Sequence, residues 1–282
     1  MTGGRSKKLL SEKCGWSKSM RINSFHTPRE IVYGWGALEH LRKMRARRAA
    51  VFTDRQPMEK YGFLKRAREY MEENGAVIGI SPDISSEPTS EDISKGLKWA
   101  QEFNPDFIVA LGGGSVIDVS KTIRSMLDRP TFDFGELTRL FDFPRNEEKV
   151  RPLVAVPTTS GTGSEVTPYV VFVDPHLRLK RVLVSEELMP DTAIVDPEVS
   201  STMPPSITAN TGFDALSHGL ESYVCTTSND FSEPLALKAI QLVFENLERS
   251  YKDGTDRNAR EKVHYASTLA GIAIANSAGG LA

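Results

Sequence analysis

The chain has 282 residues, 39% of them hydrophobic and 26% charged, with a formal net charge of −2 at pH 7. This is the composition of an ordinary globular protein, and its length favours two domains over one small core. The near-neutral charge gives no electrostatic reason to expect nucleic acid or an anionic membrane as a partner, and no apolar run reaches the roughly 20 residues that span a bilayer.

The first 20 residues are basic and lack the apolar segment of a signal peptide, so we expect a disordered tail over residues 1–20. The cysteines, Cys14 and Cys225, form neither a CxxC motif nor a disulfide framework. That usage is typical of a reducing compartment and favours a cytoplasmic protein.

Short apolar runs and amphipathic runs alternate from about residue 21 to residue 195. The pattern predicts strands over 48–54, 76–80, 106–111 and 152–157, and helices over 64–75, 90–103 and 115–127. Ser90 is the expected N-cap of the second helix. Continuous apolar strands that alternate with helices are typical of a doubly wound, mostly parallel sheet, so we expect an α/β domain over residues 21–195.

The pattern changes after a stretch at 191–205 that is rich in proline and short polar residues. Only helical periodicity follows, over 206–225, 232–252 and 256–276. Ser232 and Asp256 are expected N-caps, and Gly254 is an expected stop. We therefore expect an all-α domain over residues 196–282.

A glycine loop, Gly112 to Ser115, lies between a predicted strand and a predicted helix in the stretch FIVALGGGSVIDVSK. Glycines let backbone N–H groups approach an anion, and the N-terminus of the helix adds unpaired N–H groups and a positive dipole end. This pattern indicates a pyrophosphate site, although it is neither GxGxxG nor a Walker motif. A tight turn without a ligand is the alternative.

A threonine loop, PTTSGTGSEVTP at residues 157–168, follows another predicted strand. Its hydroxyls lie at the carboxyl end of a parallel strand, the edge at which ligands bind in open sheets. The alternative is a polar surface loop. Asp54 ends the first strand, where a carboxylate accepts a ribose hydroxyl and repels a 2′-phosphate, which favours NAD over NADP; an ordinary turn aspartate is equally compatible with its position.

Four motifs in this order resemble the iron-containing (group III) alcohol dehydrogenases, which are related to glycerol dehydrogenase and dehydroquinate synthase. They are FIVALGGGSVIDVSK, AVPTTSGTGSEVTP, AIVDPE and TANTGFDALSHGLESYV, and the resemblance runs from about Phe25 to the last residue. It implies a dehydroquinate synthase-like fold, with an NAD(P)-binding α/β domain followed by a helical domain that holds a divalent metal. It also implies a homodimer.

The resemblance assigns the site residues one by one. Asp54 matches a position linked to cofactor preference, and Lys180 matches a lysine near the nicotinamide ribose. By the same resemblance, the residues expected to contact the pyrophosphate and nicotinamide side are Gly113, Gly114, Ser115 and Asp118. Those expected to hold the adenosine ribose and nicotinamide regions are Thr158, Thr159, Thr162 and Ser164.

Asp214 and His218 match the first two of the family's four metal ligands. Residues four apart share one face of a helix, so a carboxylate oxygen and an imidazole nitrogen can converge on one Fe²⁺ or Zn²⁺ ion. Gly212 in the same helix suggests the close approach of another helix or a ligand. We expect His264 to be a partly buried helix histidine, and the remaining histidines (His26, His40 and His176) lie in the nucleotide half.

The family's further metal histidines come after the glycine-rich segment at which this chain ends, so the resemblance also implies an incomplete helical domain. The small-residue face of its last helix is expected to lack its partners and to favour association. The expected activity is hydride transfer between a small primary alcohol or aldehyde and NAD(P), with no general base assigned. The alternatives are a nucleotide-binding remnant without catalysis, and a polyol dehydrogenase or dehydroquinate synthase-like relative.

Overall fold

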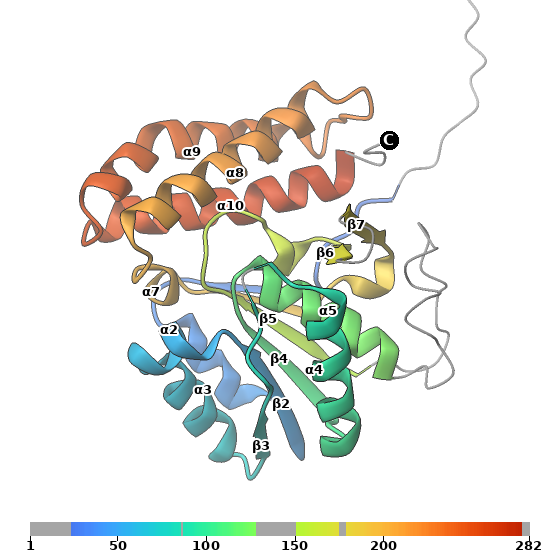
Figure 1. Cartoon of the computed structure of the whole chain (residues 1–282). Coiled ribbons are helices and arrows are strands. Elements are labelled where there is room, and N and C mark those ends of the chain that lie inside the picture. Colours follow the sequence, from blue (N-terminus) through green and yellow to red (C-terminus); the bar gives the residue numbers. More distant parts are fainter. Residues whose placement is uncertain (1–23, 86, 128–150, 175–178, 278–282) are drawn as a thin grey trace, which may run out of the picture.

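The computed structural model describes residues 24–85, 87–127, 151–174 and 179–277. The expected tail over 1–20, Cys14 and His176 lie outside these residues. The described chain forms a sheet layer flanked by helices, with long helices packed across one end of the sheet (Figure 1). No helix in this described part is long and apolar enough to span a membrane.

The sheet has six strands in the order β1-β8-β5-β4-β2-β3, and every neighbouring pair is parallel. Its strands are β1 (Glu30–Tyr33), β2 (Arg48–Thr53), β3 (Val77–Ile80), β4 (Phe107–Gly112), β5 (Leu153–Pro157) and β8 (Thr192–Val195). The predicted doubly wound α/β fold is therefore confirmed. The order in which strands are added to the sheet reverses between β2 and β4: β3 lies beyond β2 on one side, and β5 lies beyond β4 on the other.

Helices cover both faces of the sheet because each strand alternates its apolar side chains between them. Phe52 and Ile108 pack in a core with the helices α4 (Ser90–Phe103) and α5 (Gly114–Leu127). Val51 and Val109 pack on the other face. That second face is covered by η1 (Ala37–Lys43), α2 (Arg55–Lys60) and α3 (Phe63–Glu72).

The N-cap of α4 is Thr89, so the prediction of Ser90 is wrong by one residue. The Thr89 hydroxyl accepts a hydrogen bond from the Asp92 N–H at 3.3 Å, and the Asp92 carboxylate accepts one from the Thr89 N–H at 3.0 Å. This reciprocal capping box explains why threonine is preferred over its serine neighbour: only Thr89 lies three residues before the acid.

A two-stranded antiparallel hairpin stands apart from the main sheet and was not predicted. It consists of β6 (Tyr169–Asp174) and β7 (Leu179–Val184) and lies next to α5. Short 3₁₀ turns precede and follow it, η2 (Ser164–Val166) and η3 (Glu186–Leu188). The alternating burial of β6 is typical of a strand with one face against a core.

After β8 the described chain is helical: α7 (Pro197–Ser200), α8 (Pro205–Val224), α9 (Glu233–Lys252) and α10 (Arg257–Ser277). The three long helices match the predicted ones within two residues at each end. A β-carbon at Gly212 would lie 2.2 Å from Leu247 Cδ1, so the predicted close approach at Gly212 is confirmed, and the neighbour is α9. The Asp256 carboxylate accepts a hydrogen bond from the Ala259 N–H at 2.9 Å, as expected of an N-cap.

Candidate functional site

Three strands end side by side at the carboxyl edge of the sheet. In the parallel register Thr53 pairs with Leu111 and Gly112 pairs with Pro157. The residues that follow these strand ends, Asp54, Gly113 and Thr158, therefore lie along one edge. This edge includes the point between β2 and β4 where the strand order reverses, which is where open α/β sheets bind ligands.

Asp54 is largely buried at this edge. Burial raises the pKa of its carboxyl to about 6, and the nearby charge of Asp83 acts in the same direction. Its Oδ1 atom is buried and has no hydrogen-bond partner in the described residues. The Asp54 side chain does not cap α2 either, so this oxygen has no protein partner among the described residues.

The glycine loop and the threonine loop lie against each other. A β-carbon at Gly113 would lie 3.3 Å from Thr159 Cγ2, and one at Gly114 would lie 2.6 Å from Thr162 Cγ2. Gly113, Gly114, Ser115, Thr159 and Thr162 all keep part of their surface exposed. The approach requires glycine at Gly114 and leaves little room for a side chain at Gly113, an arrangement that suits the binding of an anion by backbone N–H groups at the N-terminus of α5.

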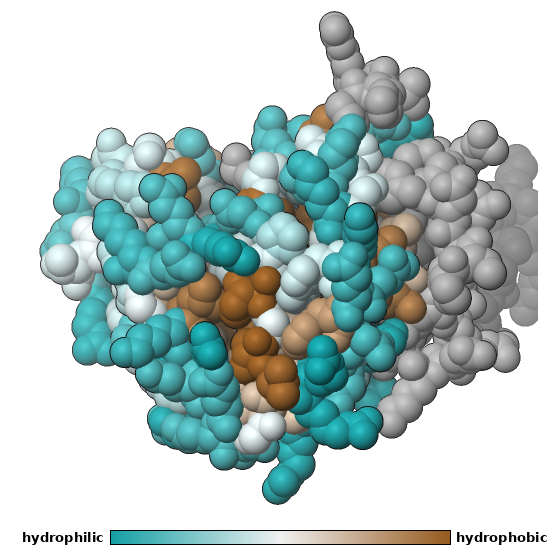
Figure 2. Space-filling model, turned by 60° about the horizontal axis from the view of Figure 1, so that its bottom comes forward, coloured by the Kyte–Doolittle hydropathy of each residue, from teal (hydrophilic) through white to brown (hydrophobic). Residues whose placement is uncertain are grey.

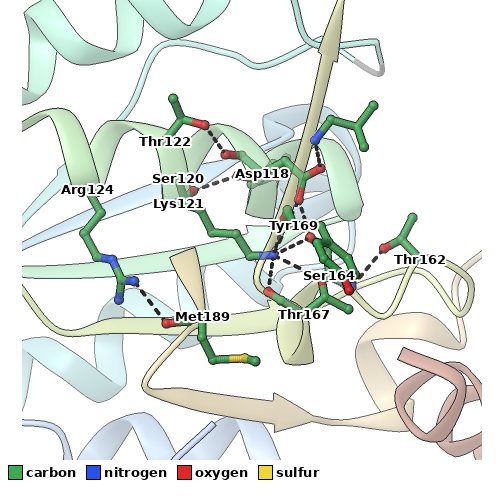
Figure 3. A network of polar contacts seen from close by, with 12 residues as sticks. Asp118, Ser120, Lys121, Thr122, Arg124, Thr162, Ser164, Thr167, Tyr169 and Met189 are labelled. Carbon is green, nitrogen blue, oxygen red and sulfur yellow. Dashed lines mark hydrogen bonds and ion pairs between the residues drawn. The ribbon is translucent and has the colours of Figure 1, made fainter. Parts of the chain in front are cut away.

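Asp118 and Ser164 are buried, and their side chains point toward each other (Figure 3). The Ser164 hydroxyl donates to Asp118 Oδ1, and the Val171 N–H donates to Asp118 Oδ2 at 2.9 Å. Burial raises the pKa of the Asp118 carboxyl, against the opposing charge of Lys121. Both side chains therefore brace the two loops, and their contact with a cofactor stays a prediction.

The helix α8 meets the threonine loop near the predicted metal pair. A β-carbon at Gly161 would lie 2.8 Å from both Cβ and the carbonyl oxygen of Thr211. Asp214 and His218 follow Thr211 by three and seven residues, so all three share one face of the helix. The face that carries the acid and the imidazole thus begins at the threonine loop.

The Asp214–His218 pair has the geometry of two converging ligands. His218 Nε2 lies 3.7 Å from Asp214 Oδ1, and both side chains are partly exposed. His218 Nδ1 is buried without a hydrogen-bond partner in the described residues. No third histidine, cysteine or acid joins them within the part of the chain that the structure describes. The donor types fit Fe²⁺ or Zn²⁺, but the pair supplies fewer than the three protein ligands usual for a catalytic ion.

The helix α10 makes a second set of contacts with the threonine loop. Gly163, at φ +62°, lies so close to Gly271 that a β-carbon on it would be 2.6 Å from Gly271 Cα. The small-residue face of α10 therefore has a partner at Gly271, contrary to the expectation that its partners are absent. The Thr268 hydroxyl donates to the buried Glu165 carboxylate at 2.7 Å.

His264 is 1% exposed, so it is fully rather than partly buried. Its Nδ1 atom shares a hydrogen bond of 2.9 Å with the Ser160 hydroxyl. Burial lowers the pKa of the imidazole to about 3, so the ring is neutral at physiological pH. His264 therefore supports the threonine loop, which its isolated position in the sequence did not indicate.

Lys180 lies on β7, exposed and opposite Val173 in the hairpin. Its predicted role beside the nicotinamide ribose stays a prediction. The sequence interpretation missed Lys121, a fully buried lysine three residues after Asp118. A lysine within the apolar helix that follows the glycine loop was the available signal.

A six-stranded parallel sheet followed by a helical layer defines a dehydroquinate synthase-like fold. Family models support the same class: residues 28–197 match the iron-containing alcohol dehydrogenase model, and residues 208–282 match the C-terminal model of the Fe-containing alcohol dehydrogenase family. The chain belongs to the iron-containing alcohol dehydrogenase family.

Individual relatives support the same family assignment. The chain is 38% identical over 253 residues to an NADPH-dependent butanol dehydrogenase from Clostridium saccharobutylicum, covering 90% of this chain and 64% of that protein. An iron-containing alcohol dehydrogenase structure from Thermococcus thioreducens superposes with a TM-score of 0.82 at 37% identity, covering 90% of this chain and 67% of that one. A sulfoacetaldehyde reductase from Bifidobacterium kashiwanohense, solved in complex with NAD⁺, gives a TM-score of 0.81 at 29% identity, covering 90% and 67%. The chain thus spans about two thirds of the length of these relatives.

Proposed function

We propose that this protein takes part in metal-dependent hydride transfer between a small primary alcohol or aldehyde and NAD(P). One observation carries the proposal: the threonine loop contacts α8 at Thr211, on the helix face that carries Asp214 and His218. This contact supports a site in which the dinucleotide edge and the acid–imidazole pair face a common space. A cofactor in one and an ion in the other would lie within reach of a single substrate.

The carboxyl edge of the sheet is suited to hold the dinucleotide. Gly113 and Gly114, which are partly exposed, offer N–H groups to a pyrophosphate, and the Asp54 carboxylate suits a ribose hydroxyl. A charged Asp54 disfavours a 2′-phosphate, which supports NAD for this chain. The butanol dehydrogenase relative is named for NADPH and the sulfoacetaldehyde reductase holds NAD⁺, so both cofactors occur among relatives.

Asp214 and His218 would hold the metal, with Fe²⁺ and Zn²⁺ both compatible with their donor atoms. When bound, such an ion would supply Lewis-acid polarisation of the oxygen of an alcohol or carbonyl. Asp214 and His218 would hold the ion on the helix face that begins at Thr211, beside the threonine loop. We assign no general base among the described residues.

The experiment separates binding from turnover. We expect the purified chain to quench or shift NADH fluorescence on binding, and to reduce NAD⁺ only slowly with 1-butanol and added Fe²⁺ or Zn²⁺. Slow turnover is expected because the described residues supply two ligands where three are usual. The absence of NADH binding at any concentration up to the millimolar range would overturn the proposal.

A second function, nucleotide binding without catalysis, is favoured by the lack of a third ligand among the described residues. NADH binding with no alcohol-dependent reduction under any metal would support it. Robust turnover would exclude it.

A homodimer and a cytoplasmic location complete the proposal. The first rests on the family resemblance and the second on the low cysteine content. Sedimentation of the purified chain tests the first, and fractionation of cells that express it tests the second.

A further inference from the structure

Lys121 is a buried cation that no part of the proposed reaction uses. Its side chain is 0% exposed, on the inner face of α5 and two turns from the glycine loop. Taking an ammonium group out of water is costly, so a lysine in this position is stable only where the surrounding protein satisfies its N–H donors. The contacts of its Nζ atom therefore indicate what the charge does.

All close acceptors of Lys121 lie in one segment, at the end of the threonine loop and the start of β6. Nζ donates to Ser164 Oγ at 3.0 Å, to the Thr167 carbonyl at 2.9 Å and to the Tyr169 carbonyl at 2.9 Å (Figure 3). An ammonium group has three N–H donors, and these three acceptors satisfy them. The lysine thus fastens the threonine loop to the helix that starts at the glycine loop.

Asp118 reinforces the same connection. Its Oδ1 atom lies 3.7 Å from Lys121 Nζ and accepts from Ser164, while Oδ2 accepts from the Val171 N–H. The charged groups that face Lys121 are Asp118 and Arg124 from its own helix and Glu165 from η2. The two predicted dinucleotide loops are therefore joined by a buried ionic network rather than by backbone pairing alone.

We propose that Lys121 is a positioning residue for the dinucleotide: it holds the threonine loop against the glycine loop in the spacing that a bound cofactor requires. This inference rests on the proposed function, because it assumes that these loops bind NAD(H). Lys121 does not touch the cofactor. It acts through Ser164 and the backbone of Thr167 and Tyr169.

Titration gives this role a signature that packing alone does not have. Burial lowers the pKa of Lys121 to about 8, against the attraction of Asp118 and Glu165. Below pH 8 the ammonium keeps its charge and three donors; above pH 8 it loses the charge and one donor. Cofactor binding therefore prefers the protonated lysine, and NADH affinity decreases as the pH rises through about 8.

Arg124 provides a matched control on the same helix. It is also a buried cation, 3% exposed, but it binds away from the threonine loop: Nη1 lies 3.1 Å from Asp191 Oδ2, and Nη2 donates to the Met189 carbonyl at 3.0 Å. Lys121→Met and Arg124→Met each remove one buried charge from α5. Only Lys121→Met removes hydrogen bonds to the threonine loop.

The test measures the Kd for NADH by fluorescence, and the melting temperature, for the wild-type chain and both variants at pH 7, 8 and 9. We expect Lys121→Met to weaken NADH binding at least tenfold and Arg124→Met at most about threefold, with comparable losses of melting temperature. Wild type should bind NADH several times more weakly at pH 9 than at pH 7, and Arg124→Met should show the same decrease in affinity at a somewhat higher pH, because the Arg124 charge lowers the pKa of Lys121. Lys121→Met should lack that step.

Equal effects of the two variants on Kd would overturn the inference. So would a wild-type Kd that is constant between pH 7 and pH 9, which can be measured even if Lys121→Met does not fold. If the wild-type chain binds no NADH, the proposed function fails and this inference fails with it. NADH binding by the wild type with a normal Kd in Lys121→Met would remove only the role of Lys121.

Discussion

Asp54 is the residue at which cofactor choice can be tested. Burial raises the pKa of its carboxyl to about 6, so the side chain is charged above pH 6 and becomes neutral as the pH falls below it. A charged Asp54 repels a 2′-phosphate. We therefore expect Asp54→Asn to improve the Kd for NADPH relative to NADH by about tenfold at pH 7.5, which corresponds to roughly 1.4 kcal/mol.

The same preference should decline with pH in the wild-type chain. Between pH 7.5 and pH 5 the ratio of the two Kd values should approach one, because protonation removes the repulsive charge. The 2′-phosphate also gains a proton near pH 6, so Asp54→Asn provides the baseline for that contribution. A pH dependence that is identical in the variant and in the wild type would argue against Asp54.

His218 and Asp214 can be tested by metal binding alone. We expect His218→Ala and Asp214→Asn each to weaken Zn²⁺ binding at least tenfold in isothermal titration, since each removes one of two converging donors. His40→Ala is the matched control, because His40 Nε2 also lies near a carboxylate, 3.3 Å from Glu30 Oε2. An equal loss of Zn²⁺ affinity in His40→Ala would show that the ion binds at neighbouring His–carboxylate pairs in general.

At the scale of elements, the contact between the threonine loop and α10 depends on Gly163. A side chain there meets both a left-handed backbone and the backbone of Gly271. We expect Gly163→Ala to lower the free energy of unfolding by roughly 3 kcal/mol or more, the sum of the conformational and overpacking costs. Urea denaturation gives the value.

Gly62→Ala is the control for the backbone component. Gly62 has φ +77° but its β-carbon would meet nothing within 4 Å, so only the conformational cost of about 1 kcal/mol applies. If Gly163→Ala and Gly62→Ala lower the free energy of unfolding equally, then the close contact between the threonine loop and α10 adds no cost to the substitution of Gly163.

The elements that the sequence predicted well are those with strong local patterns. The buried runs of β2, β4 and β5 and the periodicity of α4 and α5 place these elements within a residue or two. The hairpin β6–β7 was not predicted because its strands are half exposed and therefore lack a continuous apolar run. The contacts of Gly161 with Thr211 and of Ser160 with His264 join residues 50 and more apart in the chain, so no local pattern encodes them.

At the scale of the whole molecule, exposed apolar side chains concentrate on the helical layer. Phe213, Val224, Phe231 and Phe244 are each more than 60% exposed. Figure 2 shows a small apolar area surrounded by hydrophilic side chains near the centre of the face that it presents. Apart from the helical layer, Val77 on the edge strand β3 is 55% exposed. Large exposed apolar areas favour association.

These two surfaces make different predictions for self-association. We expect Phe244→Glu to reduce the weight-average mass of concentrated solutions in light scattering, with no loss of melting temperature, because the side chain is 71% exposed. Val77→Glu should have a smaller effect, since Val77 belongs to a short edge strand. If Val77→Glu reduced the weight-average mass more than Phe244→Glu, the associating surface would lie at the edge of the sheet.

The central claim is that Asp214 and His218 open onto the space in which the glycine and threonine loops hold the nicotinamide. The most direct measurement adds Mn²⁺ to the chain with NAD⁺ and compares the broadening of the nicotinamide and adenine protons by NMR. The account predicts stronger broadening of the nicotinamide protons, and its loss in His218→Ala. Equal broadening at both ends of the dinucleotide, or broadening that persists in the variant, would contradict it.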